Sequence, residues 1–343
     1  MFSNLYNVTI LLFILFFLLN YFFLKYNILL DSQSHLDHKK YANLQSTPYT
    51  GGIVLVIYFL FLYDLNFIEK LAYFSMFLLG LLSDSSKIVS AKKRFLFQIL
   101  IVIVFIKFEN ILIFNVRVDY INYLLNNYYL FQLFFTVFCL VILINGSNFI
   151  DGLNVLNAGY YIIIFFNLSY FFYDSGFDFI SANPKLILGF LLVFFFYNIL
   201  NKSFFGDAGS YLIGFYTGVL LIEFIKVNDQ ISPYYIAMLL WYPSFEILFT
   251  LCRRIFFDKK KINTPDNYHL HHLIFKYIKK KIKNINFSNT LSGLVINLFN
   301  AIIIFISSHF FYSSSVQIFL ILLMVTIYIS IYIILRINNL LKL

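Results

Sequence analysis

The stretch FFGDAGSYLIGFYTGVLLIEFI, residues 204–225, joins an acid framed by glycines to a long apolar run. The apolar part, 208–225, matches the length of about 17–25 residues that an α-helix needs to cross the hydrocarbon of a bilayer. It is apolar all round, whereas a strand of a membrane barrel would alternate polar and apolar residues. The stretch therefore predicts a membrane-spanning helix with Asp207 at its start.

Similar apolar runs recur along the whole chain of 343 residues, of which 61% are hydrophobic and only 12% charged. This composition excludes a soluble globular protein and predicts an all-α, polytopic membrane bundle that forms a single domain over residues 1–343. One connection, 109–127, contains a β-like run that allows a short hairpin. We expect eleven transmembrane helices, near 7–29, 51–66, 70–83, 95–109, 128–145, 158–174, 184–200, 208–225, 233–252, 290–310 and 315–336.

The basic residues are distributed unevenly between alternate connections. Most of the 25 lysines and arginines lie in the odd-numbered connections or after the last span, and basic residues in short connections favour the cytoplasm. We therefore expect the N-terminus outside and the C-terminus in the cytoplasm, in the plasma (inner) membrane. No soluble module carries the net charge of +9, so no nucleic-acid partner is expected. The predicted cytoplasmic loops are about 30–50, 83–94, 145–158, 200–208 and 253–289.

These five loops also hold most of the unusual polar residues, which predicts one site built from several helix ends. Asp207 is preceded by a glycine and followed by Ala-Gly-Ser, so the helix start offers amides that can meet a phosphate. A carboxylate beside a phosphate requires an intervening cation, and Mg²⁺ takes few protein oxygens and completes its shell with water and substrate phosphate. Asp207 therefore predicts a Mg²⁺ site, with Mn²⁺ as the alternative ion. The competing interpretation is a solvated acid at the membrane boundary.

Asn145, Asn148, Asp151 and Asn154 recur every third residue in the fifth connection. On a helix this spacing lines them along one face, which we expect to face a ligand at the depth of Asp207. The alternative is a polar stripe that bridges two helices of the bundle.

His269, His271 and His272 stand among basic residues in the ninth connection. A zinc site is disfavoured, because no cysteine or well-placed carboxylate completes a tetrahedral set. We expect these histidines to donate hydrogen bonds to a diphosphate.

Six motifs in the same order resemble those of the polyprenyl-phosphate N-acetylhexosamine-1-phosphate transferases, the MraY/WecA-like superfamily. The motifs are TPYTGG (47–52), GLLSD (80–84) with AKKRFLFQ (91–98), NGSNFIDGLN (145–154), FFGDAGS (204–210), the segment from PSFE to RR (243–254) and HLHH (269–272). The resemblance implies ten or eleven helices, a cytoplasmic active site and a requirement for Mg²⁺. It implies transfer of a sugar 1-phosphate, such as N-acetylglucosamine 1-phosphate, from a UDP-sugar to undecaprenyl or another polyprenyl phosphate, with release of UMP. This reaction would initiate synthesis of a cell-surface polysaccharide, and HLHH favours the WecA-like branch.

The resemblance also implies a role for each matching residue. Asp207 and Asn148 would bind the metal, and Asp84 would orient the lipid phosphate or accept its residual proton. Contacts to the phosphates would come from Lys93, His271 and His272, and the remaining substrate-binding residues would be Gly51, Gly52, Asn145, Asp151, Asn154 and His269.

Two positions depart from the family pattern, because Ser83 and Asn154 stand where relatives usually carry aspartate. Ser83 cannot act as a carboxylate base. The lipid phosphate is largely a dianion near neutral pH, so we expect it to attack the β-phosphorus of the UDP-sugar directly.

Several alternatives remain open at this point. They are a phospho-MurNAc-pentapeptide transferase, a non-catalytic relative that binds UDP-sugar, and a membrane transporter. A transporter would show ionisable residues near mid-membrane and an internal repeat, whereas only Glu223 and Glu246 lie well inside predicted spans and no repeat is seen. A homodimer is compatible with the sequence.

Overall fold

The computed structural model describes residues 5–30, 47–173, 177, 179, 183–257 and 268–340. Within these ranges the protein is helical, without a strand, which confirms the predicted all-α class. An isolated antiparallel bridge joins Leu30 to Pro48. Most of the predicted loop 30–50, and residues 258–267 of the predicted loop 253–289, lie outside the described residues.

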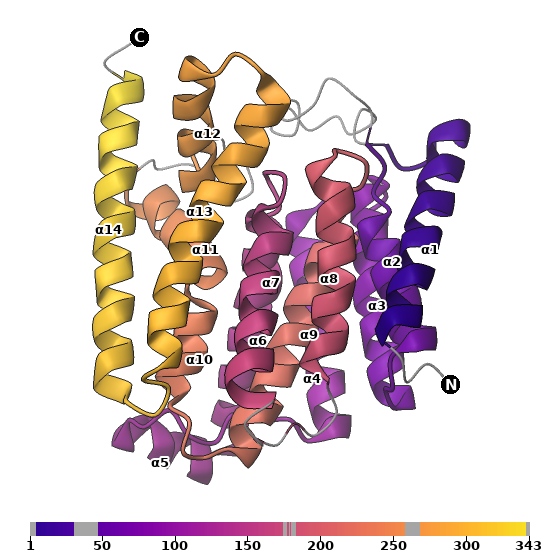
Figure 1. The fold of residues 1–343 in the computed structure, drawn as a ribbon. Helices are drawn as coiled ribbons and strands as arrows, with labels where there is room; N and C mark the ends of the chain where they lie inside the picture. Colours follow the sequence, from indigo (N-terminus) through magenta and orange to yellow (C-terminus); the bar gives the residue numbers. More distant parts are fainter. Residues whose placement is uncertain are drawn as a thin grey trace.

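The helices form one bundle in which α1 begins at the lower end and α14 ends at the upper end (Figure 1). In chain order the elements are α1 (Leu5–Tyr26), α2 (Gly51–Ile57), the π-helical turn η3 (Tyr58–Leu62), α3 (Phe67–Asp84), α4 (Ala91–Glu109), α5 (Asp119–Asn127), α6 (Tyr129–Phe149), α7 (Leu156–Asn167), the π-helical turn η4 (Leu168–Phe172), α8 (Pro184–Ile199), α9 (Gly206–Val227), α10 (Pro233–Leu239), α11 (Trp241–Cys252), the π-helical turn η6 (Arg253–Phe257), α12 (Leu270–Lys281), α13 (Ile285–Ser308) and α14 (Ser314–Leu340).

Each predicted apolar run coincides with a helix or with two consecutive helical segments, but their lengths differ. Among the described residues, five helices are long and apolar enough to cross a membrane: α1, α6, α9, α13 and α14. Counting α10 and α11 as one span bent by 75° gives six, and three further apolar helices are shorter. The chain is therefore a multi-pass, all-α membrane protein, while the count of eleven spans and the orientation stay predictions.

The β-like run before α5 does not pair with another strand, so the predicted hairpin is wrong. Its backbone bonds to side chains of α6 instead: the Ile113 amide donates to Thr136 Oγ1 at 3.1 Å, and Gln132 Nε2 donates to the Ile113 carbonyl at 3.1 Å. The second half of the connection 109–127 forms the short helix α5. Because buried polar groups on α6 satisfy this backbone, no partner strand is needed.

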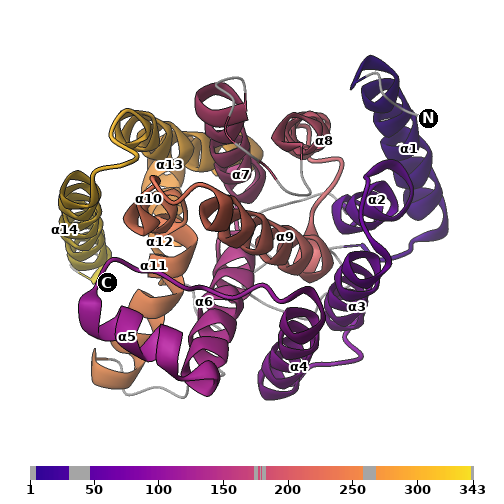
Figure 2. The same ribbon diagram turned by 90° about the horizontal axis from the view of Figure 1, so that it is seen from below.

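Helix α9 lies at the centre of the bundle, where α2, α3 and α6 pack around it (Figure 2). Small residues make the contacts close. A Cβ atom on Gly80 of α3 would lie 2.3 Å from the Cα of Ala208, and one on Gly52 of α2 would lie 2.5 Å from the amide nitrogen of Gly209. Small residues commonly allow membrane helices to approach in this way. The start of α9, and Asp207 with it, is therefore held at a fixed place between α2 and α3.

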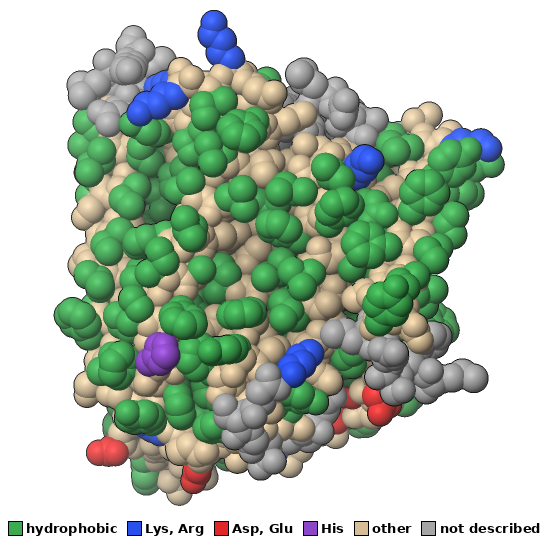
Figure 3. All heavy atoms as spheres, in the orientation of Figure 1, with side chains coloured by type: hydrophobic (Ala, Val, Ile, Leu, Met, Phe, Trp, Pro, Cys, Tyr) green, Lys and Arg blue, Asp and Glu red, His purple; other side chains and the backbone are tan. Residues whose placement is uncertain are grey.

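On the face of the bundle seen in Figure 3, charged side chains separate along the bundle axis. In the view of Figure 3 most Lys and Arg side chains lie near the upper end, where α14 ends, and Asp and Glu lie at the lower end, with hydrophobic side chains between them. This distribution agrees with the expectation that the upper end faces the cytoplasm.

Replacing Gly80 with alanine is expected to lower the thermal stability of the protein, because the added Cβ would meet the Ala208 backbone, which cannot rotate away. Overpacking of this kind costs about 1–3 kcal/mol. Gly218→Ala on α9 is the matched control, since its Cβ would meet mainly the flexible end of Leu140, at 2.6 Å. Thermal unfolding of both variants in detergent measures the difference. Equal unfolding midpoints would contradict the close approach of α3 to α9.

Candidate active site

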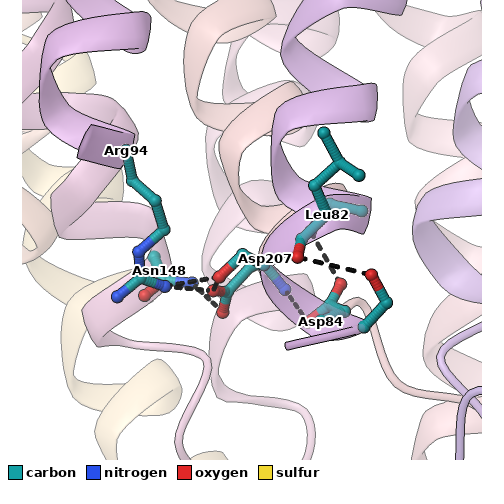
Figure 4. A network of polar contacts seen from close by, with 8 residues as sticks. Leu82, Asp84, Arg94, Asn148 and Asp207 are labelled. Carbon is teal, nitrogen blue, oxygen red and sulfur yellow. Dashed lines mark hydrogen bonds and ion pairs between the residues drawn. The ribbon is translucent and has the colours of Figure 1, made fainter. Parts of the chain in front are cut away.

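Asp207 is a mostly buried carboxylate in the first turn of α9, with 9% of the residue exposed. Its Oδ2 atom lies 2.8 Å from Nη1 of Arg94 and accepts a hydrogen bond from Ser83 Oγ. Its Oδ1 atom accepts a hydrogen bond of 2.7 Å from Asn148 Nδ2 (Figure 4). Side chains from the ends of α3, α4 and α6 thus converge on one acid, as a site built from several helix ends requires.

Asp84, the last residue of α3, caps the start of α9. Its Oδ1 and Oδ2 atoms accept hydrogen bonds from the backbone amides of Asp207, at 2.9 Å, and Ala208, at 3.1 Å. A carboxylate at this place satisfies free amides and complements the helix dipole. Gly206 precedes these amides with φ of +67°, and a Cβ there would lie 2.5 Å from Asp84 Oδ2, so only glycine fits. Asp84 therefore already satisfies these two amides, and a contact between this helix start and a phosphate stays a prediction.

The basic residue that reaches Asp207 is Arg94, not Lys93. Arg94 is half-buried and its guanidinium also donates to Ser83 Oγ, whereas the Lys93 side chain is exposed. Neighbouring residues on a helix point about 100° apart, and α4 begins at Ala91, so Lys93 and Arg94 point in different directions. The predicted contact of Lys93 to the phosphates stays a prediction. The motif AKKRFLFQ indicates that a basic residue lies near the site. Which of its basic residues faces Asp207 depends on where the helix begins, and the sequence alone did not fix that residue.

The predicted ladder from Asn145 to Asn154 does not lie along one helix face, because α6 ends at Phe149. Asn148 reaches Asp207, and Asn145 donates to Gln98 Oε1 of α4 at 2.6 Å. Asp151 lies half-buried in the turn that follows. The prediction of a single ligand-facing stripe is wrong, since the chain leaves the helix after its second member.

Asn154 is buried where the loop after α6 meets the loop after α8 and the start of α13. Its backbone amide donates to Asn289 Oδ1 at 2.7 Å, and its side-chain amide donates to Asn201 Oδ1. The residue is 2% exposed, so its polar atoms serve the packing of the chain. A contact to the nucleoside stays a prediction for Asp151 and is not supported by the position of Asn154.

Gly51 and Gly52 are also buried packing residues. A Cβ on Gly51 would lie 2.5 Å from the Phe194 ring, and its amide donates to the Phe204 carbonyl at 2.9 Å. Gly52 abuts Gly209, as described above. Both glycines shape the site by bringing α2 against the start of α9, and their predicted contact to substrate stays a prediction.

The three histidines pack together over the turn that follows α6. The rings of His271 and His272 have centroids 4.2 Å apart, and a Cβ on Gly152 would lie 2.7 Å from His271 Nε2 and 3.0 Å from His272 Nε2. His269 stacks on His271 with centroids 5.4 Å apart. This places the ninth connection directly against the loop that carries Asp151.

His271 differs from the other two because it is fully buried and, among the described residues, neither of its ring nitrogens has a hydrogen-bond partner. Burial, followed by the proximity of His272 and His269, holds the pKa of His271 well below its usual value of 6.5. The ring is therefore neutral near neutral pH. A direct contact between this ring and phosphate, which we predicted from HLHH, would require the surrounding chain to move.

The residues around Asp207 fit a weakly held magnesium ion. In the described part of the chain no group of three or more His, Cys, Asp and Glu side chains could hold a metal. Mg²⁺ needs only one or two carboxylates and takes water and substrate phosphates as its other ligands. Asp207 with the adjacent Asn148 offers that minimum, whereas Asp84 uses its oxygens on the α9 backbone. The zinc alternative gains no support from this donor set.

Comparison with known proteins matches this region to one family. The model of glycosyl transferase family 4 matches residues 67–225, a range that contains Asp84, Arg94, Asn148 and Asp207. A probable undecaprenyl-phosphate N-acetylglucosaminyl 1-phosphate transferase of Bacillus subtilis is 29% identical over 210 residues, which cover 60% of this chain and 56% of that protein.

Two other relatives extend the comparison. An undecaprenyl-phosphate alpha-N-acetylglucosaminyl 1-phosphate transferase of Thermotoga maritima is 30% identical over 147 residues, 43% of this chain and 44% of that protein. A phospho-N-acetylmuramoyl-pentapeptide-transferase of Prochlorococcus marinus is 28% identical over 289 residues, 70% of this chain and 73% of that protein. The matched part of this chain thus spans about half the length of the first two relatives.

The neutral, buried state of His271 predicts a specific dependence of stability on pH. Below about pH 6.5 the unfolded chain binds a proton at this residue that the folded protein does not, so the free energy of unfolding falls as pH decreases. His271→Phe should therefore lose less stability than the parent between pH 7.5 and about 5.5. His309→Phe, at an exposed histidine, is the control and should behave like the parent. Thermal unfolding measured across this pH range tests the prediction. Parallel curves of unfolding midpoint against pH for the parent and His271→Phe would contradict the buried neutral state.

Proposed function

We propose that this chain, whose residues 67–225 match the model of glycosyl transferase family 4, transfers a sugar 1-phosphate from a UDP-sugar to a polyprenyl phosphate. The products are UMP and a polyprenyl diphosphate that carries the sugar. The names of the Bacillus subtilis and Thermotoga maritima relatives favour N-acetylglucosamine 1-phosphate as the transferred group and undecaprenyl phosphate as the acceptor. Such a lipid would serve as the first intermediate of a cell-surface polysaccharide.

The observation that carries this proposal is the Asp207 carboxylate, kept buried where the ends of α3, α4 and α6 meet. A buried acid is costly unless it is paired, and here its one cationic partner in these contacts is Arg94. The arrangement holds a guanidinium, and could hold a bound ion, at one point where these helix ends meet. Both substrates of the proposed reaction are anionic phosphates, which such a point attracts and orients.

The positions of Ser83 and Asp84 support direct attack by the lipid phosphate. Ser83 Oγ donates to Asp207 and accepts from Arg94, so it completes the hydrogen bonds of the acid. Asp84 is engaged by two backbone amides and serves to position the start of α9. A phosphate monoester is largely a dianion at neutral pH and can attack without a protein base. The proposed reaction therefore depends on positioning and charge, and Asp84 acts as a positioning residue.

Asp207 and Asn148 are the residues that would hold Mg²⁺. When bound, the ion would offset negative charge on the diphosphate and on the departing UMP. Arg94 competes with it, because the guanidinium lies against Asp207 Oδ2. We infer that the phosphates of the UDP-sugar would draw Arg94 away from Asp207, which would leave this acid and Asn148 able to hold the ion.

We place the site at the cytoplasmic face of the plasma membrane. The support is the concentration of basic side chains at the upper end of the bundle, where α14 ends (Figure 3). Nucleotide sugars are made in the cytoplasm, so this orientation gives the donor access to the site. The polyprenyl chain would then lie along the apolar outer faces of the helices.

Substitution of Asp207 tests the proposed function. Asp207→Asn keeps the size of the side chain and removes its charge, so release of UMP from UDP-N-acetylglucosamine with undecaprenyl phosphate and Mg²⁺ should fall about 100-fold or more. Asp119→Asn, at an exposed acid on α5 at the opposite end of the bundle, should leave the rate unchanged. Parent activity in Asp207→Asn would remove the basis of the proposal.

A panel of UDP-sugars in the same assay identifies the donor through the mass of the lipid product. The Prochlorococcus marinus relative makes UDP-MurNAc-pentapeptide the second donor to include. Product from that donor alone would favour the pentapeptide branch over N-acetylglucosamine.

Competition between Arg94 and the metal gives a separate prediction. Arg94→Ala should increase the affinity of the nucleotide-free protein for Mn²⁺ about tenfold, which corresponds to roughly 1.4 kcal/mol, because the competing guanidinium is gone. Lys93→Ala is the matched control, since it removes an equal charge from the neighbouring, exposed position. Mn²⁺ binding followed by electron paramagnetic resonance distinguishes the two. Equal affinities in the two variants would show that Arg94 does not compete for the site.

A further inference from the structure

A second polar centre, separate from Asp207, joins α11, α14 and the segment before α12. Glu246 of α11 is fully buried, and its Oε1 atom lies 3.0 Å from Nδ1 of His269. Its Oε2 atom accepts a hydrogen bond of 2.8 Å from the hydroxyl of Tyr328 on α14. Thr250, one turn after Glu246, places its Oγ1 atom 3.3 Å from the same Nδ1. All four residues lie outside the range 67–225 that the family model matches.

The pattern of donors fixes the chemistry of this group. The Tyr328 hydroxyl donates to one oxygen of Glu246, and the other oxygen faces a ring nitrogen, so the carboxyl group acts as a pure acceptor. A hydrogen bond from His269 to a carboxylate oxygen of Glu246 requires that the ring carry its proton on Nδ1. The second ring nitrogen, Nε2, is left for another partner, as when a carboxylate orients a functional histidine.

His269 lies beside the last turn of α6, the turn that also carries Asn148 of the site around Asp207. The ring packs edge-on against Phe149, with centroids 5.1 Å apart. Phe149 follows Asn148, whose amide holds Asp207. His269 also keeps a small exposed fraction of 8%, whereas His271 is fully buried without a hydrogen bond. Of these two rings, His269 is the one with a bonded carboxylate and access to the outside.

We propose that Glu246 and Tyr328 are positioning residues that hold His269 with its proton on Nδ1, so that Nε2 contacts the diphosphate of the nucleotide sugar. The contact to the diphosphate rests on the proposed transferase function, whereas the state of the ring does not. Tyr328 is itself held by aromatic packing, with ring centroids 4.9 Å from Phe245 and 5.1 Å from Phe249. The C-terminal helix α14 thereby takes part in ordering the active end of the bundle.

A purely structural role of Glu246 predicts a different result from a role that acts through His269. If Glu246 only anchored the segment before α12, its replacement would affect the protein whether or not His269 is present. If it acts through the ring, its effect disappears once the ring is gone. A double-mutant cycle and a direct measurement of the ring nitrogens therefore separate the two roles.

The ring state is measured by nitrogen NMR of purified protein labelled with ¹⁵N-histidine, and the signals of His269 are identified by their loss in His269→Gln. The parent should show His269 with a protonated Nδ1 and a bare Nε2. Glu246→Gln should redistribute the proton between the two nitrogens, and Tyr328→Phe should do so to a smaller extent. Tyr332→Phe, one turn further along α14, is the matched control and should leave the signals unchanged. A proton on Nε2 in the parent would overturn the proposal.

The contact to substrate is measured on the same sample by adding UDP with Mg²⁺, which should shift the Nε2 signal of His269. In the UMP-release assay, kcat should fall about tenfold or more in Glu246→Gln and less in Tyr328→Phe, with little change in KM for the UDP-sugar. In the His269→Gln background, Glu246→Gln should have no further effect. If the losses of kcat in Glu246→Gln and His269→Gln multiply in the double variant, the proposed role of the pair is wrong. An Nε2 signal that UDP does not shift would also overturn it.

The NMR measurements also separate this proposal from the proposed function. A parent protein that releases no UMP from any UDP-sugar would refute the transferase. The ring state and its response to Glu246→Gln would still decide whether the carboxylate positions His269.

Discussion

The candidate active site depends on one constraint, namely that a buried carboxylate at the start of α9 must receive hydrogen bonds from several directions. Asp207 lies in a bundle of apolar helices, where an unpaired charge would cost several kcal/mol. Ser83, Arg94 and Asn148 supply the donors from three different helices. Meeting this requirement brings the ends of α3, α4 and α6 to one place, and that convergence is the site.

The convergence is possible because the helices around α9 can approach very closely. Gly80 and Gly52 bring α3 and α2 against the backbone of Ala208 and Gly209. That approach carries the end of α3 to the first amides of α9, where Asp84 serves as a cap. The glycines therefore determine where the charged side chains of the site meet. Glycines in the motifs of this chain serve packing first, and they place the chemistry through it.

The sequence allowed the helical class and the acid at the centre of the candidate site to be predicted, because long apolar runs and a lone acid among glycines are conspicuous in a membrane protein. It could not fix helix registers. Arg94 rather than Lys93 faces Asp207 because α4 begins at Ala91, and the predicted polar ladder breaks because α6 ends at Phe149. Glu246 and Tyr328 are 82 residues apart and both lie in apolar runs, so their contact had no local signal. The position of Glu246 inside a predicted span was the one hint.

The last turn of α6 links the two polar centres. Asn148 holds the acid at the start of α9, and the next residue, Phe149, packs on His269, which Glu246 and Tyr328 hold from the other side. A substrate diphosphate between Asp207 and His269 would therefore contact groups fixed by α6 on one hand and by α11 and α14 on the other. Because the two centres share this turn, a shift of α6 would change both together. The proposed reaction needs the polar groups of both centres at one diphosphate. The last turn of α6 holds the two centres next to each other without a direct bond between them.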